Sequence, residues 1–200
     1  MKGVFVLMAC LLAVFLPQQD CDAACIGDGG GKKVLVAYFS VSGNTRAAAE
    51  HIASVTDGDV WSIEPVLPYS RRDLDYRTAA SRSNREQHDV RARPQMFRDT
   101  PRLDRYDIVF VGYPIWWGIA PRIIQSFLEG GDFRGKTVIP FCTSAESPLD
   151  KSVEQIHKSA PGAEWKQGRR FAAGASREEV AEWVRTVLSD LPEGLCGEPE

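Results

Sequence analysis

Hydrophobic and polar residues follow two different periodicities along this chain. Continuous apolar runs are typical of strands that are buried on both faces, as in parallel sheets. Such runs predict strands over residues 33–39, 60–63, 106–112 and 137–142. Apolar residues at helical spacing predict helices over residues 46–55, 121–129, 149–159 and 177–191. Because strands and helices alternate, the chain is expected to form parallel βαβ units in a doubly wound α/β sheet.

The C-terminal part of this pattern gives a strong helix signal and a weak strand signal. Ser176 and Glu179 form a capping box at the start of the last helix. A fifth strand either includes residues 164–166 or lies nearer Arg170 and Phe171. The sequence alone leaves both positions open.

Residues 65–105 do not fit the alternation. They are rich in Arg, Asp and Ser, and they predict one helix around residues 77–87. Because the segment is too polar to bury a core of its own, we interpret it as an excursion within a single domain over residues 33–191. Ten arginines and six acidic residues lie between residues 71 and 105. This favours a solvated face of mixed charge, and the alternative is docking of an acidic partner or an anionic substrate.

The first 24 residues predict a secretory signal peptide. Lys2 supplies a positive start, residues 4–16 are almost wholly apolar, and residues 17–24 are polar and end in small residues. The apolar run is too short to span a bilayer as a helix, which takes about 20 residues. We therefore expect an exported protein, periplasmic or secreted, without a membrane span after cleavage. An apolar first strand or an uncleaved anchor is the alternative.

Composition narrows the classes of function. The chain has 200 residues, of which 44% are hydrophobic, and a formal net charge of -3. These values suit one domain and give no reason to expect nucleic acid as a partner. The five cysteines include no C-x-x-C pair or Cys/His cluster, so no metal site is predicted. His51, His88 and His157 have no cysteine or acid at catalytic spacing, and Cys142 is interpreted as a small buried hydrophobe.

The turn after the first predicted strand carries the first candidate site. It reads S-V-S-G-N-T over residues 40–45 and precedes a helix. Hydroxyl groups, a glycine and free amides at a helix N-terminus together favour binding of a phosphate. The turn has no Lys or Arg, unlike a Walker loop, so hydrolysis of a Mg-nucleotide is not supported. An ordinary Ser/Asn turn with a helix cap is the alternative.

Two further loops are expected at the same edge of the sheet. After the third predicted strand, residues 113–118 read Y-P-I-W-W-G. Adjacent tryptophans in a loop favour packing against a flat aromatic ligand, although they could instead cap the core. After the fourth strand, residues 142–147 read C-T-S-A-E-S, and an ordinary Ser/Thr-rich turn is the alternative there. Ligands of doubly wound sheets bind outside the carboxyl ends of the strands, where these loops fall.

Together, these segments resemble the flavodoxin family, particularly its short members with a Y-P-I-W-W-G loop. The resemblance covers residues 33 to about 188. It implies a flavodoxin-like three-layer α/β sandwich around a five-stranded parallel sheet, in the order 2-1-3-4-5, and a non-covalently bound FMN. The phosphate-binding residues that it implies are Ser40, Ser42, Gly43, Asn44 and Thr45. The implied residues around the isoalloxazine ring are Tyr113, Pro114, Ile115, Trp116, Trp117 and Gly118, with Thr143 and Ser144 completing the pocket.

The third loop departs from the family pattern. Related sequences often read T-S-G-G-S-G where this chain reads T-S-A-E-S-P over residues 143–148. The loss of both glycines limits backbone freedom beside the flavin, and Glu146 adds negative charge. We expect FMN to be retained and its redox potential to be affected.

The resemblance implies an electron carrier that serves a redox partner protein or a small electron acceptor. Because the cofactor does the chemistry, no catalytic residue is predicted. One alternative is an FMN-dependent NAD(P)H reductase of quinones, nitro or azo compounds, and another is a non-redox module that binds a different phosphate ligand. Helices of this topology run opposite to the strands, which brings Cys25 and Cys196 to one pole, away from the flavin. A disulfide between these two cysteines is therefore predicted.

Overall fold

The computed structural model describes residues 32–191 of the chain. The predicted signal peptide (residues 1–24), the tail (residues 192–200), Cys25 and Cys196 lie outside the described residues. The predictions made for them therefore stay predictions.

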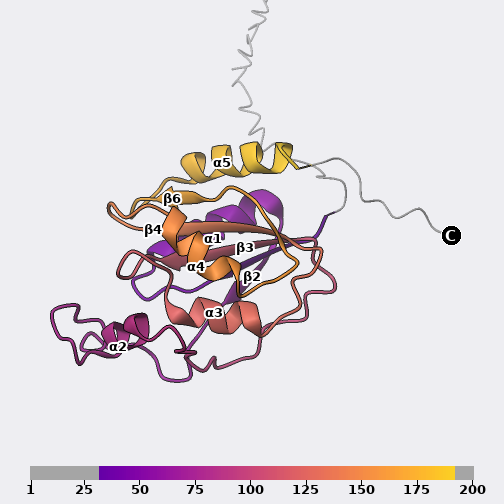
Figure 1. Ribbon diagram of the computed structural model, residues 1–200. Coiled ribbons are helices and arrows are strands. Elements are labelled where there is room, and N and C mark those ends of the chain that lie inside the picture. The colour runs from indigo at the N-terminus through magenta and orange to yellow at the C-terminus, as the bar shows by residue number, and fades with distance from the viewer. Residues whose placement is uncertain (1–31, 192–200) are drawn as a thin grey trace, which may run out of the picture.

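A parallel sheet runs through the centre of the domain (Figure 1). Its strand order is β2-β1-β3-β4-β5. β5 pairs with the first residues of β4, and β6 pairs with the last residues of β4 on the same side. The predicted order is confirmed. The strands are β1 (Val34–Tyr38), β2 (Asp59–Ser62), β3 (Ile108–Pro114), β4 (Thr137–Thr143), β5 (Glu164–Trp165) and β6 (Arg169–Phe171).

The fifth strand is split because β4 contains a proline. The Lys166 amide donates to the Val138 carbonyl at 2.9 Å, and in a regular parallel ladder residue 140 would then donate back to residue 166. Pro140 has no N–H, so that bond cannot form. Gly168 then passes so close to β4 that a Cβ on it would lie 2.1 Å from the Pro140 carbonyl oxygen. Both predicted positions of the fifth strand are therefore occupied, by β5 and by β6.

Helices cover both faces of the sheet and make it the middle of three layers (Figure 1). On one face α1 (Asn44–Thr56) and α5 (Arg177–Ser189) bury their apolar sides together with residues such as Val36 and Phe110. On the other face α3 (Arg122–Glu129) and α4 (Asp150–His157) enclose a second core. β1 is buried along its whole length, as its uninterrupted apolar run predicted.

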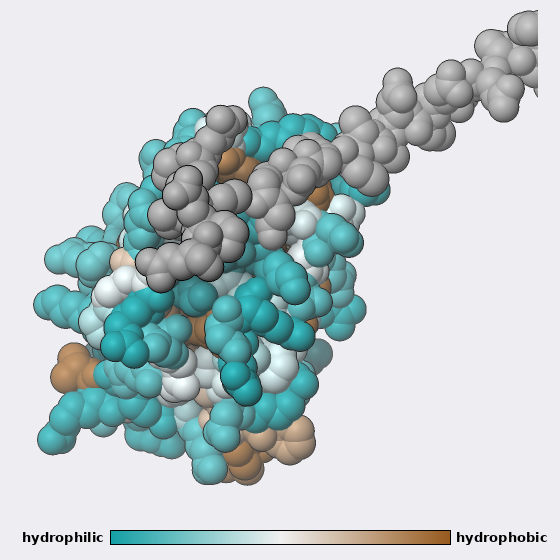
Figure 2. Space-filling view, turned by 90° about the vertical axis from the view of Figure 1, so that its right-hand side faces the viewer, coloured by the Kyte–Doolittle hydropathy of each residue, from teal (hydrophilic) through white to brown (hydrophobic). Residues whose placement is uncertain are grey.

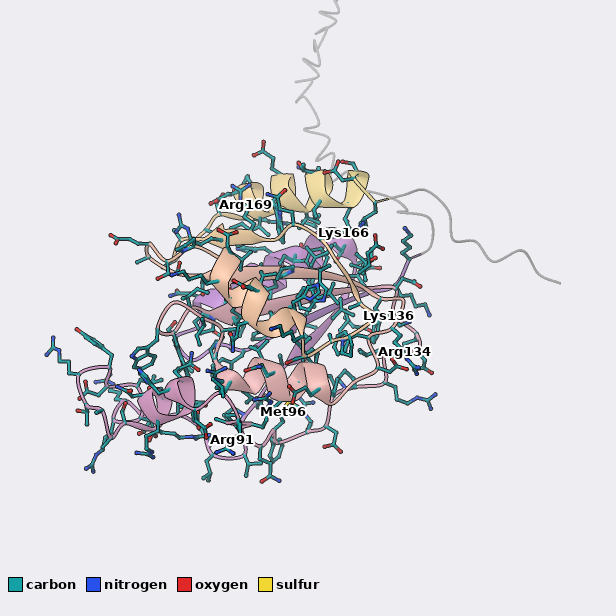
Figure 3. The ribbon with its side chains drawn as sticks, viewed as in Figure 1. Arg91, Met96, Arg134, Lys136, Lys166 and Arg169 are labelled. Carbon is teal, nitrogen blue, oxygen red and sulfur yellow. The ribbon has the colours of Figure 1, made fainter. Side chains whose placement is uncertain are left out.

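The polar excursion holds one short helix, α2 (Arg82–His88), and is partly built into the core. Ser81 caps α2 by accepting a hydrogen bond from the Asn84 amide, so the helix begins later than predicted. Met96, labelled in Figure 3 beneath α3, packs against the core on that face and pairs with Pro65. The excursion is therefore anchored to the core by a few apolar side chains, while most of its charged residues are exposed.

The end of the molecule opposite α2 is mostly hydrophilic where Figure 2 shows described residues. Arg134 and Lys136 lie toward this end (Figure 3). Within residues 32–191, no helix is long and apolar enough to cross a bilayer.

Candidate functional site

Strand register brings the three predicted loops to one edge of the sheet. Tyr38 of β1 lies beside Gly112 of β3, and Gly112 lies beside Phe141 of β4. The loops that follow these strands therefore leave the sheet at nearly the same level. The excursion with α2 extends past this edge (Figure 1). We call this edge the rim, and define it as residues 40–45, 114–119 and 143–147.

The first rim loop presents an open helix N-terminus. Gly43 adopts a positive φ of 92°, and its amide donates to the Ser40 hydroxyl oxygen at 3.1 Å. Within the described part of the chain, no side chain caps α1, whose first-turn amides have no intrahelical acceptor. Ser42 and Asn44 are exposed beside them. Amides and the helix dipole at such a terminus attract an anion.

The first and third loops are joined by a buried pair of hydroxyl groups. The Oγ1 atoms of Thr45 and Thr143 lie 2.7 Å apart, and both residues are buried. Whichever hydroxyl donates, the other keeps its hydrogen for a further acceptor. The pair therefore fixes the spacing of the two loops and retains one donor.

The second loop contains a tight turn in which Trp117 is strained. The Trp116 amide donates to the Ile119 carbonyl at 2.9 Å, and the Ile119 amide donates back at 3.1 Å. Trp117 and Gly118 both have positive φ, 51° and 78°, as a type I′ turn requires. Tryptophan is a costly residue in this conformation. The turn leaves the Trp117 side chain 39% exposed at the rim.

The two tryptophans have different surroundings. The Trp116 ring packs edge to face against Phe39 at 5.4 Å and against Tyr69 at 5.1 Å between centroids. Trp117 has one ring contact among the described residues, with His88 at 6.5 Å. Trp116 is thus largely stabilised by protein aromatics, and Trp117 presents its ring to solvent. Sequence reasoning missed Tyr69, because the excursion gave no periodic signal that would place it.

Tyr69 belongs to a partly buried cluster on the excursion. Its hydroxyl donates to the Glu86 carboxylate, and the Arg82 guanidinium lies 4.1 Å from the centroid of its ring. Burial, followed by the bond to Glu86, raises the pKa of Tyr69 well above its ordinary value. The phenol therefore stays neutral at physiological pH and acts as a packing group beside Trp116.

An arginine supports the third loop. The Arg170 guanidinium donates to the carbonyls of Ser144 and Ala145 at 3.0 and 3.2 Å, and the Ser144 amide donates to the Phe171 carbonyl at 3.1 Å. The loop is therefore held by β6 although it lacks the family's glycines. Glu146 is exposed. Arg170 was identified only as part of a weak strand, and only the structure connects it to the rim.

Tyr113 and Cys142 lie in the core, below the rim. The Tyr113 hydroxyl donates to the Ser152 hydroxyl at 3.1 Å, since Ser152 itself donates to the Leu149 carbonyl at 2.6 Å. Any contribution of Tyr113 to the rim therefore comes from its backbone. Burial raises the pKa of the Cys142 thiol to about 12. This thiol stays protonated and is a poor nucleophile.

Pro114, Ile115 and Gly118 complete the set of predicted residues at the rim. All three are partly exposed. The Ile115 amide donates to the Thr143 carbonyl at 3.2 Å, which connects the second loop to the third. Among residues 32–191, no group of three or more His, Cys, Asp or Glu side chains could hold a metal ion.

A doubly wound parallel sheet in the order β2-β1-β3-β4-β5, with helices on both faces, is the α/β fold of the flavodoxin type. A family model described as flavodoxin matches residues 33–187. The chain therefore belongs to the flavodoxin family.

Solved structures agree with this assignment. A protein described as a flavoprotein from Bacteroides uniformis is 44% identical, with a TM-score of 0.74, over 78% of this chain and 99% of that one. A second one, from Bacteroides eggerthii, is 41% identical, with a TM-score of 0.72, over 78% and 97%. A flavoprotein from Lactobacillus acidophilus, solved in complex with FMN, shares the fold at 24% identity and a TM-score of 0.58, over 76% and 98%. No curated protein matches this chain.

Proposed function

We propose that this protein binds FMN non-covalently at the rim and acts as an electron carrier. The observation that carries the proposal is the presence of two complementary features at one edge: an uncapped helix N-terminus and a strained turn that exposes an indole ring. The first suits a phosphate and the second suits a flat ring. The Lactobacillus acidophilus flavoprotein, which shares the fold, is described as an FMN complex.

The residues at the rim fit the parts of FMN. The phosphate would be held by the hydroxyls and amides of residues 40–45, and Gly43 leaves open space where a Cβ would project. The ring would lie against residues 114–118 and would be bordered by Thr143 and Ser144. Bound flavin supplies one- and two-electron transfer. The loops supply hydroxyls, amides and aromatic rings, which bind and orient the ligand without moving protons at neutral pH.

Titration with FMN tests this proposal. The protein should quench flavin fluorescence with a dissociation constant in the micromolar range or below. Riboflavin, which lacks the phosphate, should bind at least about tenfold more weakly, because each charge-assisted bond to a phosphate contributes about 1.5–3 kcal/mol. Equal affinity for both would refute the role of residues 40–45, and no quenching by folded protein would refute flavin binding and favour a module for another phosphate ligand.

An electron carrier and an NAD(P)H reductase differ in whether they need a separate enzyme to oxidise NAD(P)H. A carrier loaded with FMN should oxidise NAD(P)H only when a separate reductase is added. Steady oxidation by the purified protein alone, with a quinone, nitro or azo acceptor, would establish the enzyme instead.

We also propose that the protein is exported and that a disulfide between Cys25 and Cys196 links the two ends of the mature chain. The support is the n-region, h-region and small-residue order of residues 1–24. The exported product should begin near residue 24 or 25, and non-reducing digestion should recover the two cysteines in one linked peptide. An intact Met1 would contradict export, and two free thiols would contradict the bridge.

A further inference from the structure

A side chain of the excursion holds the tryptophan turn from outside the sheet. Gln87 of α2 is only 5% exposed. Its Nε2 group donates to the Trp116 carbonyl at 2.9 Å and to the Ala120 carbonyl at 3.2 Å. These two carbonyls flank the Trp117–Gly118 turn, so one amide group ties both ends of the turn to α2.

The backbone of Gln87 is itself anchored. Arg122 of α3, also 5% exposed, donates to the Gln87 carbonyl at 2.8 Å and to the Glu86 carbonyl at 3.2 Å. A third bond joins Arg122 to the Gln125 side chain at 2.9 Å. α2 is therefore fixed to α3 by buried bonds, and Gln87 acts on the turn from a rigid base. Its neighbour His88 lies against the Trp117 ring.

Packing alone does not account for a glutamine at this position. The Gln87 Oε1 atom is buried and has no hydrogen-bond partner within the described part of the chain. An unpaired buried oxygen costs free energy that an apolar side chain of the same shape would avoid. Exchanging the positions of the amide nitrogen and oxygen would not help, because the oxygen would then face the Trp116 and Ala120 carbonyls, which are acceptors themselves. The donor group is therefore the part of this side chain that the structure uses.

We propose that Gln87 is a positioning residue of the ligand site: its amide holds the strained turn in the geometry that presents the Trp117 ring at the rim. This assignment rests on the proposed function, in which that ring borders the flavin. It gives the excursion a defined part in the site, since α2 shapes the turn from residues far away in the sequence.

Gln87→Met tests the assignment, with Gln125→Met as its matched control. Gln125 is similarly buried and accepts hydrogen bonds from Arg122 and from Gln155. Gln155 accepts in turn from the Ala120 amide, so Gln125 reaches the end of the turn only indirectly, and no hydrogen bond joins it to residues 116–119 among residues 32–191. Gln87→Met should weaken FMN binding about tenfold, and Gln125→Met less than about threefold. Gln87→Glu should weaken binding progressively as the pH is raised, because the carboxyl can donate to these carbonyls only while it is protonated. Thermal melting of each variant without ligand should show that the fold is kept.

A readout without flavin separates the two hypotheses. The near-ultraviolet circular dichroism of ligand-free protein should lose tryptophan intensity in Gln87→Met and keep it in Gln125→Met. If wild-type protein fails to bind FMN, the proposed function falls, and this spectrum still reports on the turn. If wild-type protein binds FMN and Gln87→Met binds equally well with an unchanged spectrum, the positioning role is overturned. Equal losses in both methionine variants would also overturn it, because they would indicate general loosening of the network.

Discussion

Replacing Gly112 with alanine is expected to lower the free energy of unfolding by about 3 kcal/mol, the upper range for overpacking a core. A Cβ at this position would lie 2.1 Å from Cζ of Phe141 and within 2.7 Å of two further ring atoms. The ring cannot easily move aside, because it is fully buried and packs against Phe171 and Trp183. For a domain of this size, the melting temperature should fall by about 10 °C.

Two comparisons isolate the cause. Gly135→Ala places a Cβ in open space at a positive φ of 69°, so it should cost only about 1 kcal/mol of backbone strain. In a chain that carries Phe141→Leu, adding Gly112→Ala should cost less than about 1 kcal/mol, because the ring edge is gone. The same cost in both backgrounds would contradict the proposed overlap. Thermal and urea unfolding of the wild type and the four variants provide the measurement.

Arg122→Met is expected to increase the fraction of molecules in which the excursion has opened away from the rest of the domain. The substitution removes the buried bond to the Gln87 carbonyl and the partly buried bond to the Glu86 carbonyl. Such losses cost about 2–3 kcal/mol, which would raise the open population of the excursion about 30- to 150-fold. Trypsin should therefore cleave faster after the exposed Arg71, Arg72 and Arg77 by a similar factor, since cleavage follows the open population when closing is fast.

Arg105→Met is the matched control for this experiment. Arg105 lies on the same excursion, but its side chain is largely exposed and its ion pair with Asp59 spans 3.3 Å. Exposed pairs contribute at most about 1 kcal/mol, so cleavage should change little. If Arg122→Met lowered the melting temperature of the whole domain without faster cleavage in the excursion, Arg122 would stabilise the core rather than hold α2 in place.

Most of the fold could be predicted because its signals are local. The runs K-V-L-V-A-Y-F and Y-D-I-V-F-V-G are almost wholly apolar, and such runs are typical of strands that are buried on both faces, as β1 and β3 are. The split of the fifth strand could not be predicted in the same way. It depends on Pro140 of a neighbouring strand, and a missing N–H has a consequence only when its partner is known.

Some residues of the site could also be predicted from local signals, and others could not. Residues 40–45 and 113–118 were found because each motif is contiguous and follows a strand. Phe39, Tyr69, Gln87 and Arg170 act on the rim through contacts between segments far apart in the sequence, and each has an ordinary local context. Tyr113 shows the opposite case, because its place in a contiguous motif did not reveal that its side chain turns into the core.

The sequence by itself determined the alternation of strands and helices and the three loops that follow the strands, since hydrophobic periodicity and turn chemistry are properties of neighbouring residues. The strand order was implied by the resemblance to the flavodoxin family and not by the periodicity. Only the tertiary structure decided which side chains support those loops. It also decided that Trp116 packs against protein aromatics while Trp117 is exposed, and that Gln87 of the excursion forms hydrogen bonds to the turn. Those outcomes depend on burial and on hydrogen bonds between distant residues, and both exist only once the chain has folded.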